Sequence, residues 1–499
     1  MVSRGIALRA TALLLCVPVT SPSLAAEATR GPAADVVGTH ILVGWNDLGM
    51  HCSNKNFADL AVLPPYNTFW SVLIQRGSHT TAPQVLGSPY TVHYILENNT
   101  FSVGKTDFWS YEDRLFGVQL PDNVGLTGNG LAGMMAPQGS HFVATGVPIT
   151  PFDDGNLTRE QPYQLTRLQA RDSNGTLLAE TEIVTPVSNE MMCSHCHHPN
   201  TGETVELAIL RKHDQENGTL LAANRPVLCA RCHASNALGM PGTPGLPSLS
   251  QAMHAAHGEV TNNCYECHPG PNTLCLRDVM SQQHSMTCQN CHGSVVDVAR
   301  SIENGRQPWL QEPRCGTCHG AAYSEAPNTL YRNSSNGHGG LFCATCHGSP
   351  HAILPSREER DNRQTIALQG YAGTLKQCDV CHGFVPSGPG PHGLYPTGVR
   401  EPLAGGTPAA KVLASPNPMT TSTELHYRVV DTTPVRLAIY DVSGRVVKVL
   451  TARSQTPGDH TLVWNGTDAQ ARRVPLGVYF CKLETGGRSA STRIVLAAH

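Results

Sequence analysis

The sequence is poor in charge, poor in aromatic side chains and almost free of long apolar runs. Only 15% of its 499 residues are charged, and 35 basic against 38 acidic side chains give a formal net charge of −3. A chain without a basic excess lacks the electrostatic footprint of a nucleic-acid-binding protein, so we expect no nucleic-acid partner. The one long apolar run lies at the extreme N-terminus, so we expect no transmembrane span in the mature chain.

The first 25 residues have the pattern of a secretory signal peptide. Two arginines provide the positive end, residues 10–19 provide the apolar stretch, and Ser23-Leu24-Ala25 provides the small residues of a cleavage site. Cleavage would also remove Cys16. The alternative is an N-terminal anchor that stays attached. Either way we expect an exported protein, periplasmic to extracellular, in a compartment where disulfides and thioethers persist.

Cysteine and histidine are abundant, with 18 and 24 residues. Fourteen of the cysteines form one pattern, Cys-x-x-Cys-His, which occurs seven times between residues 193 and 382. Two thiols at this spacing add to the vinyl groups of a haem, and the histidine that follows is placed as proximal ligand of the iron. The alternative is zinc, but zinc does not require a histidine after every pair, and seven pairs do not combine evenly into four-thiolate sites. The repeat therefore predicts seven covalently bound c-type haems.

We number the motifs 1 to 7 in chain order. The predicted attachment cysteines are Cys193 and Cys196, Cys229 and Cys232, Cys264 and Cys267, Cys288 and Cys291, Cys315 and Cys318, Cys343 and Cys346, and Cys378 and Cys381. The predicted proximal ligands are His197, His233, His268, His292, His319, His347 and His382. A segment with so little protein per motif has a thin apolar core, so we expect short helices, long loops and haems that fill the interior.

The sixth ligand of each iron decides between an electron relay and an open site for a substrate. Seven histidines outside the motifs are the candidate distal ligands: His213, His254, His257, His284, His338, His351 and His392. Because their number equals the number of motifs, we expect low-spin iron throughout, electron transfer rather than catalysis, and no catalytic residue. Alternative ligands for some irons are His195, His198, Met253, Met280 and Met286. The sequence does not pair individual candidates with motifs.

Residues 36–190 contain no such motif and alternate as β-strands do. We expect strands over residues 40–44, 68–74, 90–96, 141–149, 163–170 and 176–187, with a hairpin turn at residues 172–175, in an all-β domain. The segment 47–52, Asp-Leu-Gly-Met-His-Cys, is unusual for a strand and loop. Its possible roles are a packed turn with a free buried Cys52 thiol, a Cys52–Cys275 disulfide, or a His51 ligand to a neighbouring haem.

Residues 393–418 are rich in proline, glycine and alanine and predict a linker. We expect strands over residues 424–430, 435–440, 446–450, 460–464, 477–483 and 491–497, which form a C-terminal β-sandwich over residues 419–499 with Cys481 as a buried free thiol. The predicted protein is multidomain: a β-rich N-terminal domain (36–190), a haem-packed segment (191–392) and this C-terminal sandwich.

The haem-motif segment resembles multihaem c-type cytochromes that work outside the bacterial cytoplasm. The matching residues, besides the motifs, are Asn336-Gly337-His338, Gly348-Ser349-Pro350-His351 and residues 308–314. The resemblance implies electron relay through closely stacked haems to redox partner proteins or extracellular acceptors, sometimes within a polymer of the chain. We expect mostly bis-His haems. The alternatives are a reductase of nitrogen or sulfur oxyanions with one open-site haem, and a filament subunit that donates a distal histidine across its interface.

The C-terminal segment resembles the Ig-like domain of flagellar hook-capping proteins and the sorting domains of type IX secretion. The matching residues are Ser415-Pro416-Asn417-Pro418, residues 439–445, Trp464-Asn465-Gly466 and residues 477–480. The resemblance implies export through the outer membrane or attachment to the cell surface, and the two versions are not separable from these residues.

Overall fold

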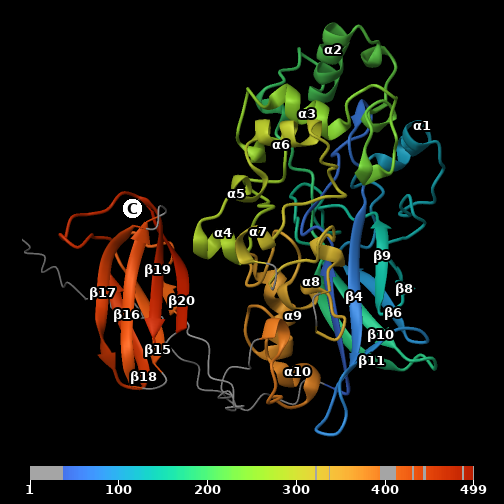
Figure 1. Cartoon of the computed structure of the whole chain (residues 1–499). Helices are drawn as coiled ribbons and strands as arrows, with labels where there is room; N and C mark the ends of the chain where they lie inside the picture. The colour runs from blue at the N-terminus through green and yellow to red at the C-terminus, as the bar shows by residue number, and fades with distance from the viewer. Residues whose placement is uncertain are drawn as a thin grey trace, which may run out of the picture.

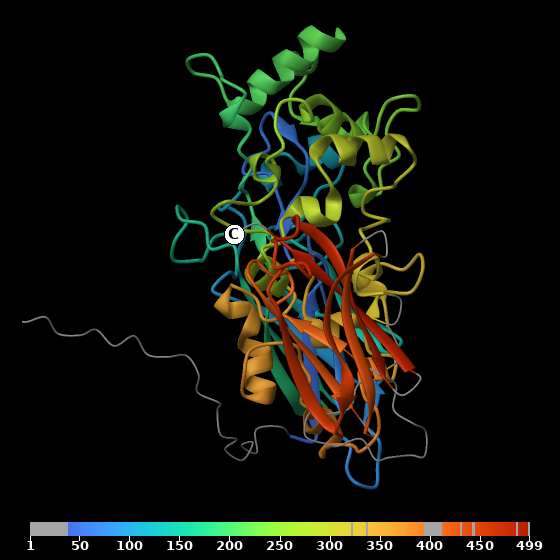
Figure 2. The same cartoon turned by 60° about the vertical axis from the view of Figure 1, so that its left-hand side comes forward.

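The computed structural model in Figures 1 and 2 describes residues 38–320, 323–335, 338–393, 412–429, 432–441, 445–485 and 488–497. The predicted signal peptide, Cys16 and most of the predicted linker lie outside these residues. The described chain is multidomain and rich in β-strands, and its helices are short, as the sequence predicts.

The N-terminal part is a sandwich of two antiparallel sheets. The first sheet has the order β1-β4-β9-β8 with β5 paired to β4, and the second has the order β11-β10-β6-β7. The strands are β1 (His40–Asn46), β4 (Asn67–Gln75), β5 (Gln84–Leu86), β6 (Thr91–Glu97), β7 (Ala132–Met134), β8 (Ala136–Gln138), β9 (His141–Val147), β10 (Leu165–Arg171) and β11 (Leu177–Val184). All six predicted strands are present, and β10 and β11 pair across the predicted hairpin turn.

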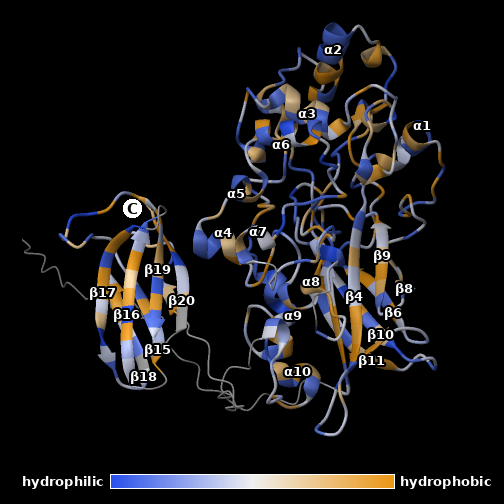
Figure 3. Ribbon diagram, viewed as in Figure 1, coloured by the Kyte–Doolittle hydropathy of each residue, from blue (hydrophilic) through white to orange (hydrophobic). Residues whose placement is uncertain are grey.

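Strands β1 and β4 are buried on both faces. Successive side chains of a strand point to opposite faces, so one set, including Leu42, Phe69 and Leu73, joins the core between the two sheets. The other set packs against the motif segment; it comprises Ile41, Val43, Trp45, Val72 and Ile74, which contact Ala344, Leu375 and Val380. Hydrophobic residues are correspondingly frequent along β4 in Figure 3. The predicted domains 36–190 and 191–392 therefore share a hydrophobic core.

Two short parallel strand pairs join distant parts of the chain. Strand β2 (His51–Cys52) pairs with β12 (Val187–Ser188). Strand β3 (Leu60–Ala61) pairs with β13 (Val227–Leu228), which directly precedes motif 2. Next to this second pair is a hydrophobic cluster that includes the buried Phe57 and residues of η1 (Phe108–Ser110) and α1 (Glu112–Phe116). These pairs anchor the start of the motif segment to the sandwich.

The motif segment is built of short helices and loops that extend along the sandwich, from α2 at one end to α10 at the other (Figures 1 and 2). The helices are α2 (Val205–Asn217), α3 (Leu249–His257), α4 (Val279–His284), α5 (Cys288–His292), α6 (Val295–Glu303), α7 (Gly316–His319), α8 (Cys343–His347), α9 (Glu359–Gln369) and α10 (Cys378–His382). Motifs 1 to 3 begin with the 3-10 turns η2 (Cys193–His195), η4 (Cys229–Arg231) and η6 (Cys264–Glu266). Within the described residues, no helix combines the length and apolar character needed to cross a membrane.

The C-terminal domain has one sheet of order β14-β15-β18 and another of order β17-β16-β19-β20. The strands are β14 (Val412–Ser415), β15 (Thr423–Val429), β16 (Thr433–Asp441), β17 (Val446–Gln455), β18 (Gly458–Trp464), β19 (Gly477–Thr485) and β20 (Arg488–Leu496). All six predicted strands are present. Strand β14 lies inside the segment predicted as a linker, so the sheet begins before residue 419. Its core contains the buried Trp464, and Cys481 is a buried free thiol as predicted.

Candidate functional site

Each Cys-x-x-Cys-His motif forms one turn of helix. The backbone N–H of the motif histidine donates to the carbonyl of the first cysteine, for example at 2.9 Å from His197 to Cys193 and at 2.9 Å from His319 to Cys315. Residues three and four apart share one face of a helical turn, so both thiols and the imidazole of a motif lie on the same side. This arrangement suits a planar ring that is held at two edges and ligated from below.

Six motif histidines each face one of the predicted distal candidates. The ring centroids are 6.1 Å apart for His197 and His257, 6.3 Å for His233 and His213, 6.2 Å for His268 and His254, 6.2 Å for His292 and His351, 6.2 Å for His347 and His392, and 5.9 Å for His382 and His338. Two imidazoles bound to opposite sides of one iron have centroids about 6.3 Å apart, from a metal–nitrogen bond of about 2.0 Å and a ring radius of about 1.15 Å. The six pairs therefore have the spacing of axial ligands.

Four of these twelve imidazoles are fixed by a hydrogen bond from Nδ1 to a backbone carbonyl. The acceptors are Ser250 for His254 at 2.7 Å, Met253 for His257 at 2.7 Å, Pro247 for His233 at 2.9 Å and Leu48 for His351 at 3.1 Å. A carbonyl only accepts, so Nδ1 carries the proton and Nε2 keeps a free lone pair. This is the tautomer of a metal-binding histidine whose other nitrogen is held by an outer partner.

Burial keeps several of these rings neutral. It lowers the pKa of His268 to about 4, with the nearby His254 and His351 adding to the effect. It likewise lowers the pKa of His292 to about 4, again reinforced by His351. A neutral imidazole is the form that binds a metal, so both rings are ready to ligate near neutral pH.

Motif 5 differs from the others. Among the described residues, no imidazole or aromatic ring faces His319, and none faces the predicted distal ligand His284. Both side chains are exposed. The alternative ligand His195 instead has its Nδ1 2.6 Å from a carboxylate oxygen of Glu266. The structure thus brings six of the seven predicted distal candidates opposite a motif histidine, whereas His284 and His319 face no ring among the described residues.

The first half of the motif row departs from chain order. Helix α3 carries both His254 and His257, one turn apart, so the pairs of motifs 3 and 1 are neighbours. Motifs 1 and 2 are neighbours as well. Glu216 of α2 lies near both His213, which faces motif 2, and His197 of motif 1: after the larger effect of Lys212, both imidazoles lower its pKa. The order at this end is therefore 2, 1, 3.

Motifs 3 to 7 follow chain order. His351 of the motif 4 pair lies close enough to His268 to lower its pKa. The pKa of Cys291 in motif 4 is raised by burial and then by Cys318, so motif 5 is next to motif 4. The pKa of Cys346 in motif 6 is raised by burial and then by Cys381, so motif 7 is next to motif 6. The pKa of His347 is lowered by burial, by His392 and by the motif 5 histidine. These proximities give the motif row the order 2-1-3-4-5-6-7, and the helices of motifs 4 to 7 (α5, α7, α8 and α10) follow one another down the view of Figure 1.

The donor set fits haem better than a bare metal ion. Within the residues that the structure describes, no group of three or more histidine, cysteine, aspartate or glutamate side chains is arranged to hold an ion. Each facing pair offers two nitrogens, so a metal held between them would take its other ligands from a non-protein group. A porphyrin would provide four such nitrogens, and the two motif cysteines would attach it.

The unusual segment 47–52 is a packed turn of the N-terminal sandwich. His51 Nε2 lies 2.8 Å from Asp47 Oδ1, and both side chains are buried, so this imidazole is engaged within its own segment. Cys52 and Cys275 are both free thiols, and burial, with Cys275 nearby, raises the pKa of Cys52 to about 12. The packed-turn interpretation is therefore the one that the structure matches.

The partners of His351, a predicted distal ligand, could not be found from the sequence. Its Nδ1 is held by Leu48, and its carbonyl accepts from the backbone N–H of Arg277 at 2.8 Å. The one available signal was the unusual composition of residues 47–52. No local sequence pattern predicts a contact between residues about 300 positions apart in the chain.

Comparison with known proteins identifies one segment of the chain. The FlgD Ig-like domain family matches residues 425–488, which include strands β16 to β19. The C-terminal domain is therefore Ig-like, in agreement with the resemblance seen in the sequence. No curated protein matches the chain.

Several solved structures share limited similarity with the chain. FlgD from P. aeruginosa is 17% identical over 18% of this chain and 77% of its own, with a TM-score of 0.14. PorZ, a surface component of the type IX secretion system of Porphyromonas gingivalis, is 21% identical over 22% of this chain and 14% of its own, also with a TM-score of 0.14. Latent PorU from the same organism covers 93% of this chain and 34% of its own at 11% identity, with a TM-score of 0.17. Similarities at this level carry no statement about function.

Proposed function

We propose that this chain is an exported electron-transfer protein that binds seven c-type haems and relays electrons along them. The observation that carries the proposal is the set of six facing histidine pairs, each with a centroid separation between 5.9 and 6.3 Å. A bound haem supplies reversible one-electron chemistry at its iron. The chain supplies the attachment thiols, the axial imidazoles and the spacing between neighbouring sites.

Bis-histidine ligation favours a relay over catalysis. Two protein ligands leave an iron no position for a substrate, so such a site exchanges electrons only. The row of motifs 2-1-3-4-5-6-7 gives each site a neighbour on either side, except at the two ends. Electrons would enter at one end of the sandwich, near α2, and leave at the other, near α10, or travel in the opposite direction.

The proposed location and partners follow from the two termini. Residues 1–25 have the signal-peptide pattern, and the thioether chemistry of the motifs belongs outside the cytoplasm. The Ig-like C-terminal domain would serve as a sorting or surface-attachment module. The electron donor and acceptor would be redox proteins or extracellular acceptors that reach the two ends of the row.

The test is a haem count and a magnetic spectrum of the protein purified from a host that attaches c-type haem. The intact mass should correspond to seven added haems, and the ferric protein should give low-spin signals for at least six of them. The double variant C378S/C381S should lose one haem and keep six. A protein that carries zinc or no haem would contradict the proposal.

A second function is favoured by motif 5 alone. Because no ring faces His319 among the described residues, a haem on this motif would keep one axial position for an exogenous ligand. Such a site is what an oxyanion reductase needs, and electrons would reach it from both sides of the row. Titration of the reduced protein with carbon monoxide should then saturate at one molecule per chain, whereas no binding would show that all seven irons have two ligands.

A further inference from the structure

The turn at Leu48 and Gly49 contacts the ligand of the middle motif in the row. The carbonyl of Leu48 accepts the Nδ1–H of His351 at 3.1 Å. Gly49 has φ of +75°, and a Cβ at this position would lie 1.7 Å from the carbonyl oxygen of Pro350, the residue before the ligand. Only glycine therefore allows the turn to approach the ligand so closely.

The turn is held from the side of the N-terminal sandwich by a buried asparagine. Asn46 Oδ1 accepts from the backbone N–H of Leu48 at 3.1 Å and of Gly49 at 2.7 Å. Its Nδ2 donates to Asn67 Oδ1 at 2.8 Å and to the carbonyl of Thr68 at 2.9 Å. These bonds fix the turn to strand β4 and set the direction of the Leu48 carbonyl.

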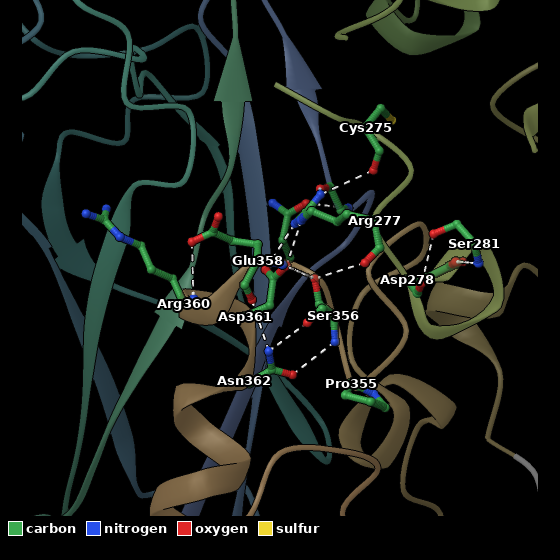
Figure 4. Close-up of polar contacts among 12 residues, drawn as sticks. Cys275, Arg277, Asp278, Ser281, Pro355, Ser356, Glu358, Arg360, Asp361 and Asn362 are labelled. Atoms are coloured by element: carbon green, nitrogen blue, oxygen red, sulfur yellow. Dashed lines mark hydrogen bonds and ion pairs between the residues drawn. The ribbon is translucent and has the colours of Figure 1, made fainter. Parts of the chain in front are cut away.

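Arg277, which Figure 4 shows beside Asp361, holds the same turn from the side of the motif segment. Its Nη1 donates to the carbonyl of Gly49 at 2.6 Å, and its backbone N–H donates to the carbonyl of His351 at 2.8 Å. Its Nε and Nη2 bind the two carboxylate oxygens of Asp361 at 2.6 and 3.0 Å. The buried side chain of Arg277 therefore ties the turn to helix α9, and its backbone N–H ties both to His351.

His351 also has a strained backbone, with φ of +60° at a non-glycine residue. A residue in the left-handed region persists where its surroundings hold it, and such residues cluster at functional sites. The contacts with Arg277 and Leu48 provide this restraint.

We propose that the Leu48–Gly49 turn, held by Arg277, is a positioning element through which the N-terminal sandwich fixes the orientation and tautomer of His351 as distal ligand of the motif 4 haem. The inference rests on the proposed function. A hydrogen bond from Nδ1 to a carbonyl raises the basicity of the ligand nitrogen, which favours the ferric state. The sandwich would thus lower the reduction potential of the haem at the centre of the row.

The test compares G49A with G117A in the haem-loaded full chain. Gly117 has a similar φ of +71°, but nothing lies within 4 Å of its added Cβ, so it controls for backbone strain alone. In G49A we expect seven haems, an upward shift in one reduction potential, and a change in one low-spin electron paramagnetic resonance signal as the two ring planes leave their 29° angle. G117A should match the wild type in all three readouts.

A conservative second variant covers the case in which G49A does not fold. R277K keeps the charge but loses the guanidinium geometry that reaches Gly49 and Asp361 at once. It should move the same potential in the same direction, by a smaller amount. Seven haems with unchanged potentials and signals in the folded variants would overturn the positioning role and leave the proposed function intact. A wild-type protein without haem would instead refute the proposed function, and the positioning role with it.

Discussion

The buried ion pair between Arg277 and Asp361 makes the sharpest stability prediction. The two side chains are 1% and 8% exposed, and two nitrogens of the guanidinium bind two oxygens of the carboxylate. Ser356 Oγ donates to Asp361 Oδ2 at 2.6 Å. In D361N the carboxylate charge is lost and an amide N–H₂ replaces one acceptor, so that donors face donors around a buried cation.

The size of the effect follows from the burial. Burial opposes the charge on Arg277, and the nearby carboxylate of Asp361 is what raises its pKa above the ordinary value. Removing one partner of a buried pair leaves an uncompensated charge and costs about 3–5 kcal/mol of unfolding free energy. We expect D361N to fall in this range.

The matched control is E182Q. Glu182 of strand β11 binds Arg363, which like Asp361 belongs to helix α9, at 2.8 Å, but these side chains are 30% and 45% exposed. A pair that exposed contributes about 0–1 kcal/mol. The loss of unfolding free energy in each variant is measured by urea unfolding, monitored by circular dichroism, on samples with the same haem count. If D361N costs no more than E182Q, the reasoning from burial is refuted.

Three further predictions concern other parts of the chain. H254A should free one axial position and add one carbon monoxide per reduced chain, whereas H284A should leave the stoichiometry unchanged; equal effects would contradict the observed pairing. W464A removes a fully buried ring from the C-terminal core and should destabilise that domain by about 3–5 kcal/mol in thermal unfolding. K105A leaves the carbonyl of Phe152 and the carboxylate of Asp154 without their buried donor, and should cost about 1–3 kcal/mol in urea unfolding.

Sequence patterns predicted the strands well because β-alternation is local. Each of the twelve expected strands is present, and residues 425–488 match an Ig-like family. The alternation of apolar and polar residues did not predict that β1 and β4 are buried on both faces. The second face is covered by Ala344, Leu375 and Val380, about 300 residues later in the chain, and no local window contains both sides of that contact.

The candidate site likewise has a part that the sequence predicts and a part that depends on packing. The proposed attachment cysteines and proximal histidines can be recognised in the sequence because one helical turn brings Cys, Cys and His to a single face. The distal partner of each motif depends on how separate helices pack, as with α3, whose two histidines face motifs 3 and 1.

The sequence was thus sufficient to establish seven Cys-x-x-Cys-His motifs and the two β-rich regions, since both depend on residues close together in the chain. The pairing of the histidines, the motif order 2-1-3-4-5-6-7 and the contact from Leu48 to His351 emerged only with the folded chain. Each of these joins residues that are distant in sequence, and their proximity is set by packing against the shared core rather than by spacing along the chain.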